Sequence, residues 1–251
     1  MLLRARRAVS SGAVSLGLLL MNVSRAGATT CQSITGYHAG QTAPSLAWSG
    51  VERYISNPGF TLYDSVQGMA MYIAVFKEIP SCSAGICSFQ AGHLKGAAPW
   101  GYATTTKAYW ETVDTEGYHG GFRNVALNQN PFYTIYFDGT YDANGGANFR
   151  AYVNAGSGPQ LMQRRPLPAI QLKVQASLEA HALLSNQCPS VNGFGYFGTN
   201  GSGSYSTTWS LYKFVHGSGW FEWVEPSDQF AEAPYWYSSI HNWSAFKVTG
   251  S

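Results

Sequence analysis

The chain has 251 residues, of which only 11% are charged and 15% are aromatic, and its formal net charge is +2. Nothing in this composition forms the basic patch that a nucleic-acid partner requires. After residue 28, no apolar run approaches the roughly 18 residues that a membrane-spanning helix needs. The 28 glycines and 16 tyrosines are typical of secreted β proteins whose solubility rests on hydroxyls and amides.

The first 28 residues have the pattern of a secretory signal. They begin with a basic segment, continue through an apolar run at 13–21 and end on Ala26-Gly27-Ala28. This order predicts cleavage after Ala28 and a secreted, extracellular protein, so residues 1–28 are set apart from the fold. The leader contains arginines and no acidic residue, which leaves residues 29–251 slightly acidic.

Four cysteines predict two disulfide bonds in an oxidising compartment. Three connectivities are open for Cys31, Cys82, Cys87 and Cys188. Cys82 and Cys87 are close enough to close a small loop, which would leave Cys31 to pair with Cys188. The spacings fit no zinc pattern and no histidine pair lies beside them, so no metal is expected. No phosphate-binding loop is present either, so no nucleotide or other cofactor is expected.

In chain order, residues 29–60 are loop-like, with Gly, Pro and Ser between short segments, and residues 61–251 are expected to form one domain because no linker or repeat divides them. Turn residues separate ten strand candidates. They lie at 69–77, 86–91, 107–113, 122–127, 132–138, 149–154, 170–176, 205–214, 220–224 and 243–248. Strands with almost no helix predict an all-β, antiparallel sandwich or jelly roll.

The strand candidate that follows Cys87 has a distinctive face. Phe89, Ala91 and His93 alternate with Ser88, Gln90 and Gly92, so Gln90 is the one bulky polar side chain on a small-walled face. An amide offers both an acceptor and donors, and it can polarise a carbonyl or stabilise the oxyanion that the carbonyl becomes. Taken alone, the segment is more simply a surface strand.

Residues 172–184 are ambiguous between a helix and a strand. They contain good helix formers, and Val174, Leu178 and the pair 182–183 have helical spacing, so the pattern slightly favours a helix. If the segment is instead a strand, Gln175, Ser177, Glu179 and His181 share one face and line a groove.

Five short motifs occur in a recognisable order: Phe89-Gln-Ala-Gly92, Ala108-Tyr-Trp-Glu-Thr112, Tyr133-Thr-Ile-Tyr-Phe137, Phe149-Arg-Ala-Tyr-Val-Asn154 and Ala176-Ser-Leu-Glu-Ala-His181. This order resembles the glutamic peptidases, which include the eqolisins and the related neprosin-like proteins. The resemblance covers about residues 69 to 225. It implies a concanavalin-like β-sandwich with a catalytic pair on its concave sheet.

Carried over to this sequence, the resemblance makes Gln90 and Glu179 the catalytic pair, with Glu111 as a competing carboxylate. Trp100, Trp110, Glu111 and His181 are then candidates for contact with the substrate. The implied activity is that of an acid endopeptidase on polypeptides, in which Glu179 takes a proton from water while Gln90 stabilises the oxyanion. A carboxylate base of ordinary pKa predicts an acidic optimum.

Two other functions are compatible with the same sequence. Aromatic residues such as Trp100 and Trp110 could instead line a glycan-binding face, although most large rings in a sandwich belong to its core. The chain would then be a non-catalytic carbohydrate-binding module. Alternatively it is a secreted surface-interaction protein in which Gln90 and Glu179 never meet. No serine-hydrolase, zinc-protease or phosphate-binding motif is present.

Overall fold

The computed structural model describes residues 37–181, 187–200, 202–204, 206, 210–224, 227–241 and 243–250. The expected leader, 1–28, lies outside this range. The described residues form strands and connecting loops, together with one short 3-10 turn at Ser83–Gly85. None of their helices is long and apolar enough to cross a membrane.

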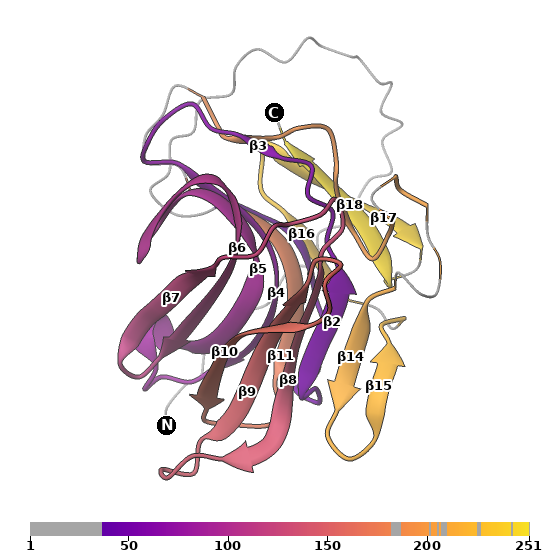
Figure 1. Cartoon of the computed structure of the whole chain (residues 1–251). Helices are drawn as coiled ribbons and strands as arrows, with labels where there is room; N and C mark the ends of the chain where they lie inside the picture. Colours follow the sequence, from indigo (N-terminus) through magenta and orange to yellow (C-terminus); the bar gives the residue numbers. More distant parts are fainter. Residues whose placement is uncertain are drawn as a thin grey trace, which may run out of the picture.

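Two large antiparallel sheets make up the body of the protein (Figure 1). The seven-stranded sheet has the order β16 (Asp228–Ala231), β1 (Tyr37–Thr42), β11 (Lys173–His181), β4 (Gly68–Glu78), β5 (Ile86–Ala98), β6 (Gly101–Asp114) and β7 (Gly117–Arg123). The six-stranded sheet has the order β10 (Gln160–Leu167), β9 (Ala147–Asn154), β8 (Phe132–Tyr141), β2 (Gly50–Tyr54), β14 (Tyr212–Val215) and β15 (Gly219–Glu222).

Two small sheets accompany them. One joins β12 (Ser190–Val191) to β3 (Phe60–Thr61), and the other joins β13 (Gly195–Phe197), β18 (Ala245–Gly250) and β17 (Tyr235–His241). The described strands pair in antiparallel fashion throughout. The predicted all-β antiparallel sandwich is therefore confirmed.

The main core lies between the two large sheets and follows from strand alternation. From the seven-stranded sheet, Ile73, Phe89 and Leu178 are fully buried in it, and Ile135 and Phe149 face them from the six-stranded sheet. Every second residue of a central strand is therefore enclosed, and most of these residues are apolar. The residues between them point to the outer face of their sheet, which leaves that face available for a site.

The helix that the pattern favours at 172–184 is wrong over Lys173–His181, which forms strand β11 between β1 and β4. Val174, Ala176, Leu178 and Ala180 all have 0% exposure, which is the period of two that a half-buried strand requires. Two rows of inter-strand hydrogen bonds and this burial outweigh the local helix propensity of the alanines and leucines. Residues 182–186 lie outside the described part of the chain.

The expectation of a loop-rich segment at 29–60 is wrong for two stretches. β1 lies between β11 and β16, and β2 lies between β8 and β14, so the segment contributes to both large sheets. The strand expected at 122–127 lies earlier, as β7, and the one expected at 205–214 overlaps β14 at 212–214. The pattern also missed β10, β16 and β17 and the short strands β3, β12 and β13.

The disulfides agree with the expected pairing as far as the structure describes them. Cys82 is bonded to Cys87, which ties the start of β5 to the preceding turn. Cys188 is also disulfide-bonded. Its expected partner, Cys31, lies outside the described residues.

Candidate active site

The outer face of the seven-stranded sheet carries polar side chains where β11, β4, β5 and β6 lie next to one another, in that order. Gln90 lies directly opposite Glu111 on β6 and opposite Ala74 on β4. The side chains of Ser88 and Gln90 point outward because Phe89 and Ala91 are buried in the inter-sheet core, and Gly92 follows on the same outer face. The predicted small-walled face around Gln90 is therefore present, and it carries a carboxylate as its nearest polar neighbour.

Glu111 accepts two hydrogen bonds, one on each carboxylate oxygen. Gln90 Nε2 donates to Oε1 over 3.1 Å, and the indole Nε1 of Trp100 donates to Oε2 over 2.7 Å. Trp100 is held in place by the ring of Tyr109, on which it stacks at 5.9 Å, and by the edge of Phe122 at 4.7 Å. The carboxylate is thus fixed from two sides by groups that are themselves packed.

Gly120 on β7 makes room for this arrangement. A Cβ atom at this position would lie only 2.0 Å from Trp100 Nε1 and 2.2 Å from Cε2. The indole therefore covers the backbone of Gly120, and any side chain there would displace it. The position of the Trp100 N–H, and with it the second hydrogen bond to Glu111, depends on this glycine.

Glu179 forms a separate ionic group on β11. His181, two residues further along the same face, places its Nε2 2.8 Å from Glu179 Oε1. Tyr72 on the neighbouring strand β4 also hydrogen-bonds to Glu179. Gln175 donates to the Tyr72 hydroxyl over 3.0 Å, so the tyrosine connects two polar residues of β11.

The two carboxyl groups differ in their pKa. Burial raises the pKa of Glu111 to about 7, although the hydrogen bond from Trp100 opposes this shift. Burial acts in the same direction on Glu179, but its contacts with His181, His38 and Tyr72 outweigh burial and lower its pKa. The same ion pair outweighs burial at His181 and raises the pKa of the imidazole. In mildly acidic solution Glu179 is therefore charged while Glu111 is neutral.

These groups line one cleft of about 260 Å³. Its walls include Gln90, Glu111, Tyr118, Glu179 and His181, and they are completed by Ser83, Ile86, Ser88, Pro99 and Val113. A larger hollow of about 480 Å³ lies among the loops around Asn128 and Asn154, but no acidic or basic side chain lines it. Another hollow, of about 460 Å³ near Asp114, Asp142 and Arg165, does have charged side chains. The smaller cleft is the stronger candidate for chemistry because burial raises the pKa of Glu111 there, while contacts that outweigh burial lower the pKa of Glu179.

The structure brings together four of the six residues predicted for the site, Gln90, Glu111, Glu179 and His181. Trp100 contributes indirectly, because it binds Glu111 rather than lining the cleft. The expectation for Trp110 is wrong: its side chain packs against the inter-sheet core, with the guanidinium of Arg165 5.1 Å from its ring centre. Adjacent residues of a strand face opposite ways, so Trp110 and Glu111 could not both face the cleft.

Two tyrosines of the site were missed from the sequence. Tyr72 hydrogen-bonds to Glu179, and Tyr118 lines the cleft from the start of β7. Tyr72 stands between Met71 and Ile73, which are buried in the core, so strand alternation did place it on the outer face. Its contact with Glu179 depends on the pairing of β4 with β11. This pairing could not be predicted while residues 172–184 were interpreted as a helix.

One group of potential metal ligands occurs among the described residues. Asp114, Glu116 and His119 lie at the turn between β6 and β7, with one ligand atom of each within 4.8 Å of the others. Glu116 is exposed, and His119 is paired with Asp114 at 3.4 Å. Acidic groups at exposed turns commonly lie close together without a metal.

The fold is therefore a two-sheet antiparallel sandwich. A cleft on the outer face of one sheet is lined by an amide and two carboxyl groups. Two solved structures share this fold. One is a crystal structure of Scytalido-glutamic peptidase with a peptide based transition state analog, which matches with a TM-score of 0.52 at 10% identity, over 89% of this chain and 100% of that one.

The second is a crystal structure of scytalido-glutamic peptidase with a transition state analog inhibitor, with a TM-score of 0.54, 9% identity and the same coverage of both chains. No family model and no curated protein matches this sequence. The likeness shows the fold expected for a glutamic peptidase, and the neprosin-like affinity stays a prediction. At this level of identity the likeness does not extend to activity.

Proposed function

We propose that this protein is a peptidase of the glutamic type that hydrolyses polypeptides in the cleft between β5, β6 and β11. The observation that carries the proposal is the meeting of Gln90, Glu111 and Glu179 in one cleft, on a fold shared with Scytalido-glutamic peptidase. An amide and ionisable carboxyl groups are sufficient for amide hydrolysis without a metal or another cofactor.

Glu179 is the better candidate for the general base. Its lowered pKa keeps it ionised in acid, so it can accept a proton from a water molecule as the water oxygen attacks the scissile carbonyl carbon. Glu179 then passes this proton to the leaving amine when the carbon–nitrogen bond breaks. The Gln90 amide donates to the oxygen that becomes negative in the tetrahedral intermediate.

Glu111 has a different role in this proposal. Its carboxyl group accepts a hydrogen bond from the Gln90 amide and thereby orients it. Because its pKa is raised to about 7, Glu111 is neutral in acid and does not repel an oxyanion nearby. As Glu111 ionises, its charge opposes the developing negative charge. Activity should therefore be lost near neutral pH, and also at low pH, where Glu179 becomes protonated.

An acid-active peptidase with disulfide bonds is consistent with action outside the cytoplasm, and we propose that the chain is secreted. Cys82–Cys87 and the disulfide-bonded Cys188 support this location. An extended polypeptide suits the cleft as substrate. The ring of Tyr118 and the small polar side chains of Ser83 and Ser88 flank the carboxyl groups and can contact such a chain.

The test is cleavage of an unfolded protein substrate between pH 3 and 8 by the wild type and by single variants. Gln90→Ala and Glu179→Gln should each lower the rate by about 10²-fold or more, as loss of an oxyanion donor does in other hydrolases. Glu116→Gln, in an exposed carboxylate outside the cleft lining, is the matched control and should keep the wild-type rate.

Glu111→Gln separates the two carboxyl groups. If Glu179 is the base, this variant stays active and its activity persists to a higher pH, because position 111 can no longer ionise. If Glu111→Gln is inactive while Glu179→Gln retains activity, the assignment of the base is wrong. A folded wild-type protein that cleaves nothing at any pH would refute the peptidase proposal itself.

A further inference from the structure

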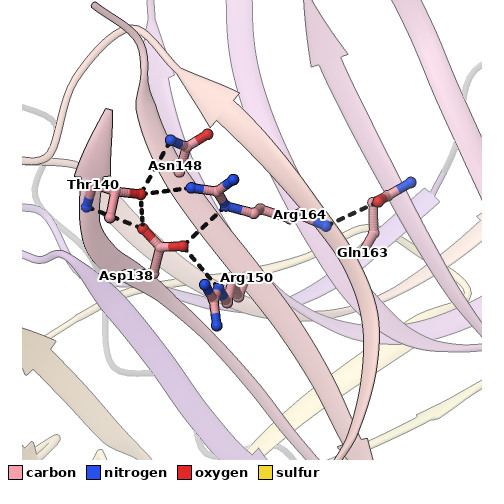
Figure 2. Close-up of polar contacts among 6 residues, drawn as sticks. All are labelled: Asp138, Thr140, Asn148, Arg150, Gln163 and Arg164. Atoms are coloured by element: carbon pink, nitrogen blue, oxygen red, sulfur yellow. Dashed lines mark hydrogen bonds and ion pairs between the residues drawn. The ribbon is translucent and has the colours of Figure 1, made fainter. Parts of the chain in front are cut away.

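A second cluster of polar side chains lies on the outer face of the six-stranded sheet, away from the cleft (Figure 2). Its centre is Asp138 on β8. Asp138 Oδ2 accepts from Arg150 Nε on β9 over 2.7 Å and from Arg164 Nε on β10 over 3.0 Å. Thr140 and Asn148 complete the cluster: Arg164 Nη2 donates to Thr140 Oγ1 over 2.6 Å, and Asn148 Nδ2 donates to the same oxygen.

The cluster holds two guanidinium groups with one carboxylate, and so it keeps a net positive charge. The Asp138 side chain is only 2% exposed, whereas the side chains of Arg150 and Arg164 are 38% and 44% exposed. Burial opposes ionisation of Asp138, but its bonds with Thr140, Arg150 and Arg164 lower its pKa and keep it charged. The arginines are thus anchored at Nε while part of each guanidinium fork faces solvent.

Aromatic rings continue from this cluster along the same face. Tyr136 stacks at 6.0 Å on Tyr152, and its ring meets the edges of Phe214 at 5.9 Å and Trp220 at 6.5 Å. Phe214 and Trp220 are also in contact, at 5.0 Å. All four rings are partly exposed. The rings therefore form one connected surface across β9, β8, β14 and β15.

Strand register places these side chains in a single row across all six strands. From β10 to β15 the directly opposed residues are Arg164, Arg150, Tyr136, Gly50, Phe214 and Trp220. At about 4.8 Å between strands, five intervals give a row of about 24 Å. Gly50, in the middle of the row, has no side chain. A Cβ atom on this residue would lie 2.9 Å from Tyr136 Cβ, so glycine here allows the rings on both sides to approach each other.

We propose that this row, from Arg164 to Trp220, binds an acidic polysaccharide, that is, a chain of sugars bearing carboxylates. Sugar rings have an apolar face, which would pack on the rings of Tyr136 and Trp220. The polar edges of these two side chains would offer hydrogen bonds to the sugar. The exposed parts of the Arg150 and Arg164 guanidinium groups offer charged N–H donors to a carboxylate, in addition to the bonds that hold each group in place. An extended polymer lying across the strands would meet both kinds of group in succession.

Two carboxyl groups lie on this face besides Asp138, those of Glu52 and Glu222, and Glu52 is neutral in acid solution. Glu52 on β2 shares the face and contacts Thr134 Oγ1 at 3.5 Å. Burial raises the pKa of Glu52 to about 7, so it is neutral at pH 5. Glu222, at the far end of β15, accepts a hydrogen bond from Ser210. A nucleic acid is a poorer match, since one of the two cations is already offset by Asp138 and strong phosphate binding needs several.

The experiment measures binding to polygalacturonate at pH 5 by titration calorimetry, with fully methyl-esterified polygalacturonate and single-stranded DNA as comparison polymers. The wild type should bind polygalacturonate, and esterification, which removes the charge and keeps the sugar ring, should weaken binding at least about ten-fold. Arg164→Gln and Trp220→Ala should each weaken binding by a similar factor. Arg123→Gln, in an exposed arginine at the end of β7, is the matched control and should not change it.

Arg164→Lys provides a finer test, because it keeps the charge and loses the planar fork. It should bind more weakly than the wild type and more tightly than Arg164→Gln. Peptide cleavage should be unchanged in all these variants, so failure here is distinguishable from failure of the proposed peptidase. Absence of binding, equal binding of the methyl ester, tighter binding of DNA, or insensitivity to both Arg164→Gln and Trp220→Ala would overturn the proposal.

Discussion

Replacing Glu111 by Gln should stabilise the protein at neutral pH and leave its stability nearly unchanged in acid. Glu111 lies between the side chains of Gln90 and Trp100, and burial raises its pKa from its ordinary value of 4.5 to about 7. Gln has almost the same shape as a protonated Glu. Its single amide oxygen can accept from the Trp100 N–H, and its NH2 group then faces the Gln90 amide, which turns its own oxygen toward it. The variant therefore mimics the neutral form of Glu111 at every pH.

The sign and size of the effect follow from linkage. Glu111 takes up its proton more readily in the folded state, so its favourable contribution is complete below pH 4.5 and is lost as the pH rises to about 7. A shift of this size corresponds to a loss of about 3 kcal/mol in the free energy of unfolding. Above pH 7, Glu111→Gln should exceed the wild type by up to this amount. Below pH 4.5 the two should agree within about 1 kcal/mol.

Urea unfolding of both proteins at pH 4 and pH 7.5 measures the difference, and contributions from other titrating groups largely cancel in it. Glu179→Gln is a control of opposite sign. Because the pKa of Glu179 is lowered, that variant should lose stability above pH 4.5, and the loss should diminish at lower pH. Equal destabilisation by Glu111→Gln at both pH values would refute the claim that the folded protein disfavours a charge at position 111.

Three further predictions concern the groups that set these pKa values. Trp100→Phe removes the N–H hydrogen bond to Glu111 but keeps an aromatic ring, so the pKa of Glu111 should rise above its wild-type value. NMR titration of the carboxyl group measures this pKa, and an unchanged or lower value would contradict the prediction. Gly120→Ala should displace the indole, raise the same pKa and lower the free energy of unfolding by about 1–3 kcal/mol, as measured in urea. His181→Gln should raise the pKa of Glu179, moving the acid limb of the pH–rate profile upward, and a limb that stays in place would show that the ion pair does not control it.

The sequence was sufficient to predict an antiparallel β-sandwich because burial alternates along its central strands. Residues 132–138 carry this period, whereas 69–77 is an almost continuous apolar run that is buried on both faces of its sheet, and both stretches are central strands. Edge strands were harder to predict. β10, with the sequence Gln160-Leu-Met-Gln-Arg-Arg-Pro-Leu167, encloses only Met162 and Leu167, so polar residues dominate its pattern. Its pairing with β9 comes from the fold and not from local propensity.

The site could be predicted in part for a related reason. Alternation around Gln90 placed it on an outer face, and the motif resemblance drew attention to Glu111 and Glu179. The direct register of Gln90 with Glu111 depends on where β5 turns into β6, and no local pattern encodes it. The wrong expectation for Trp110 came from treating it and its neighbour Glu111 as one motif, although a strand necessarily sends them to opposite faces.

The two glutamates also illustrate what a motif alone leaves open. Glu111 and Glu179 are the same residue type in the same cleft, and their roles are distinguished by surroundings that come from distant parts of the chain. Burial dominates at Glu111, whereas His181 and Tyr72 outweigh burial at Glu179. A pair of carboxyl groups with separated pKa values can hold one charged and one neutral member at the same pH. Acid hydrolysis with Glu179 as base requires this division, and it depends on β11 being a strand, since only a strand places Glu179 and His181 side by side on the face that Tyr72 shares.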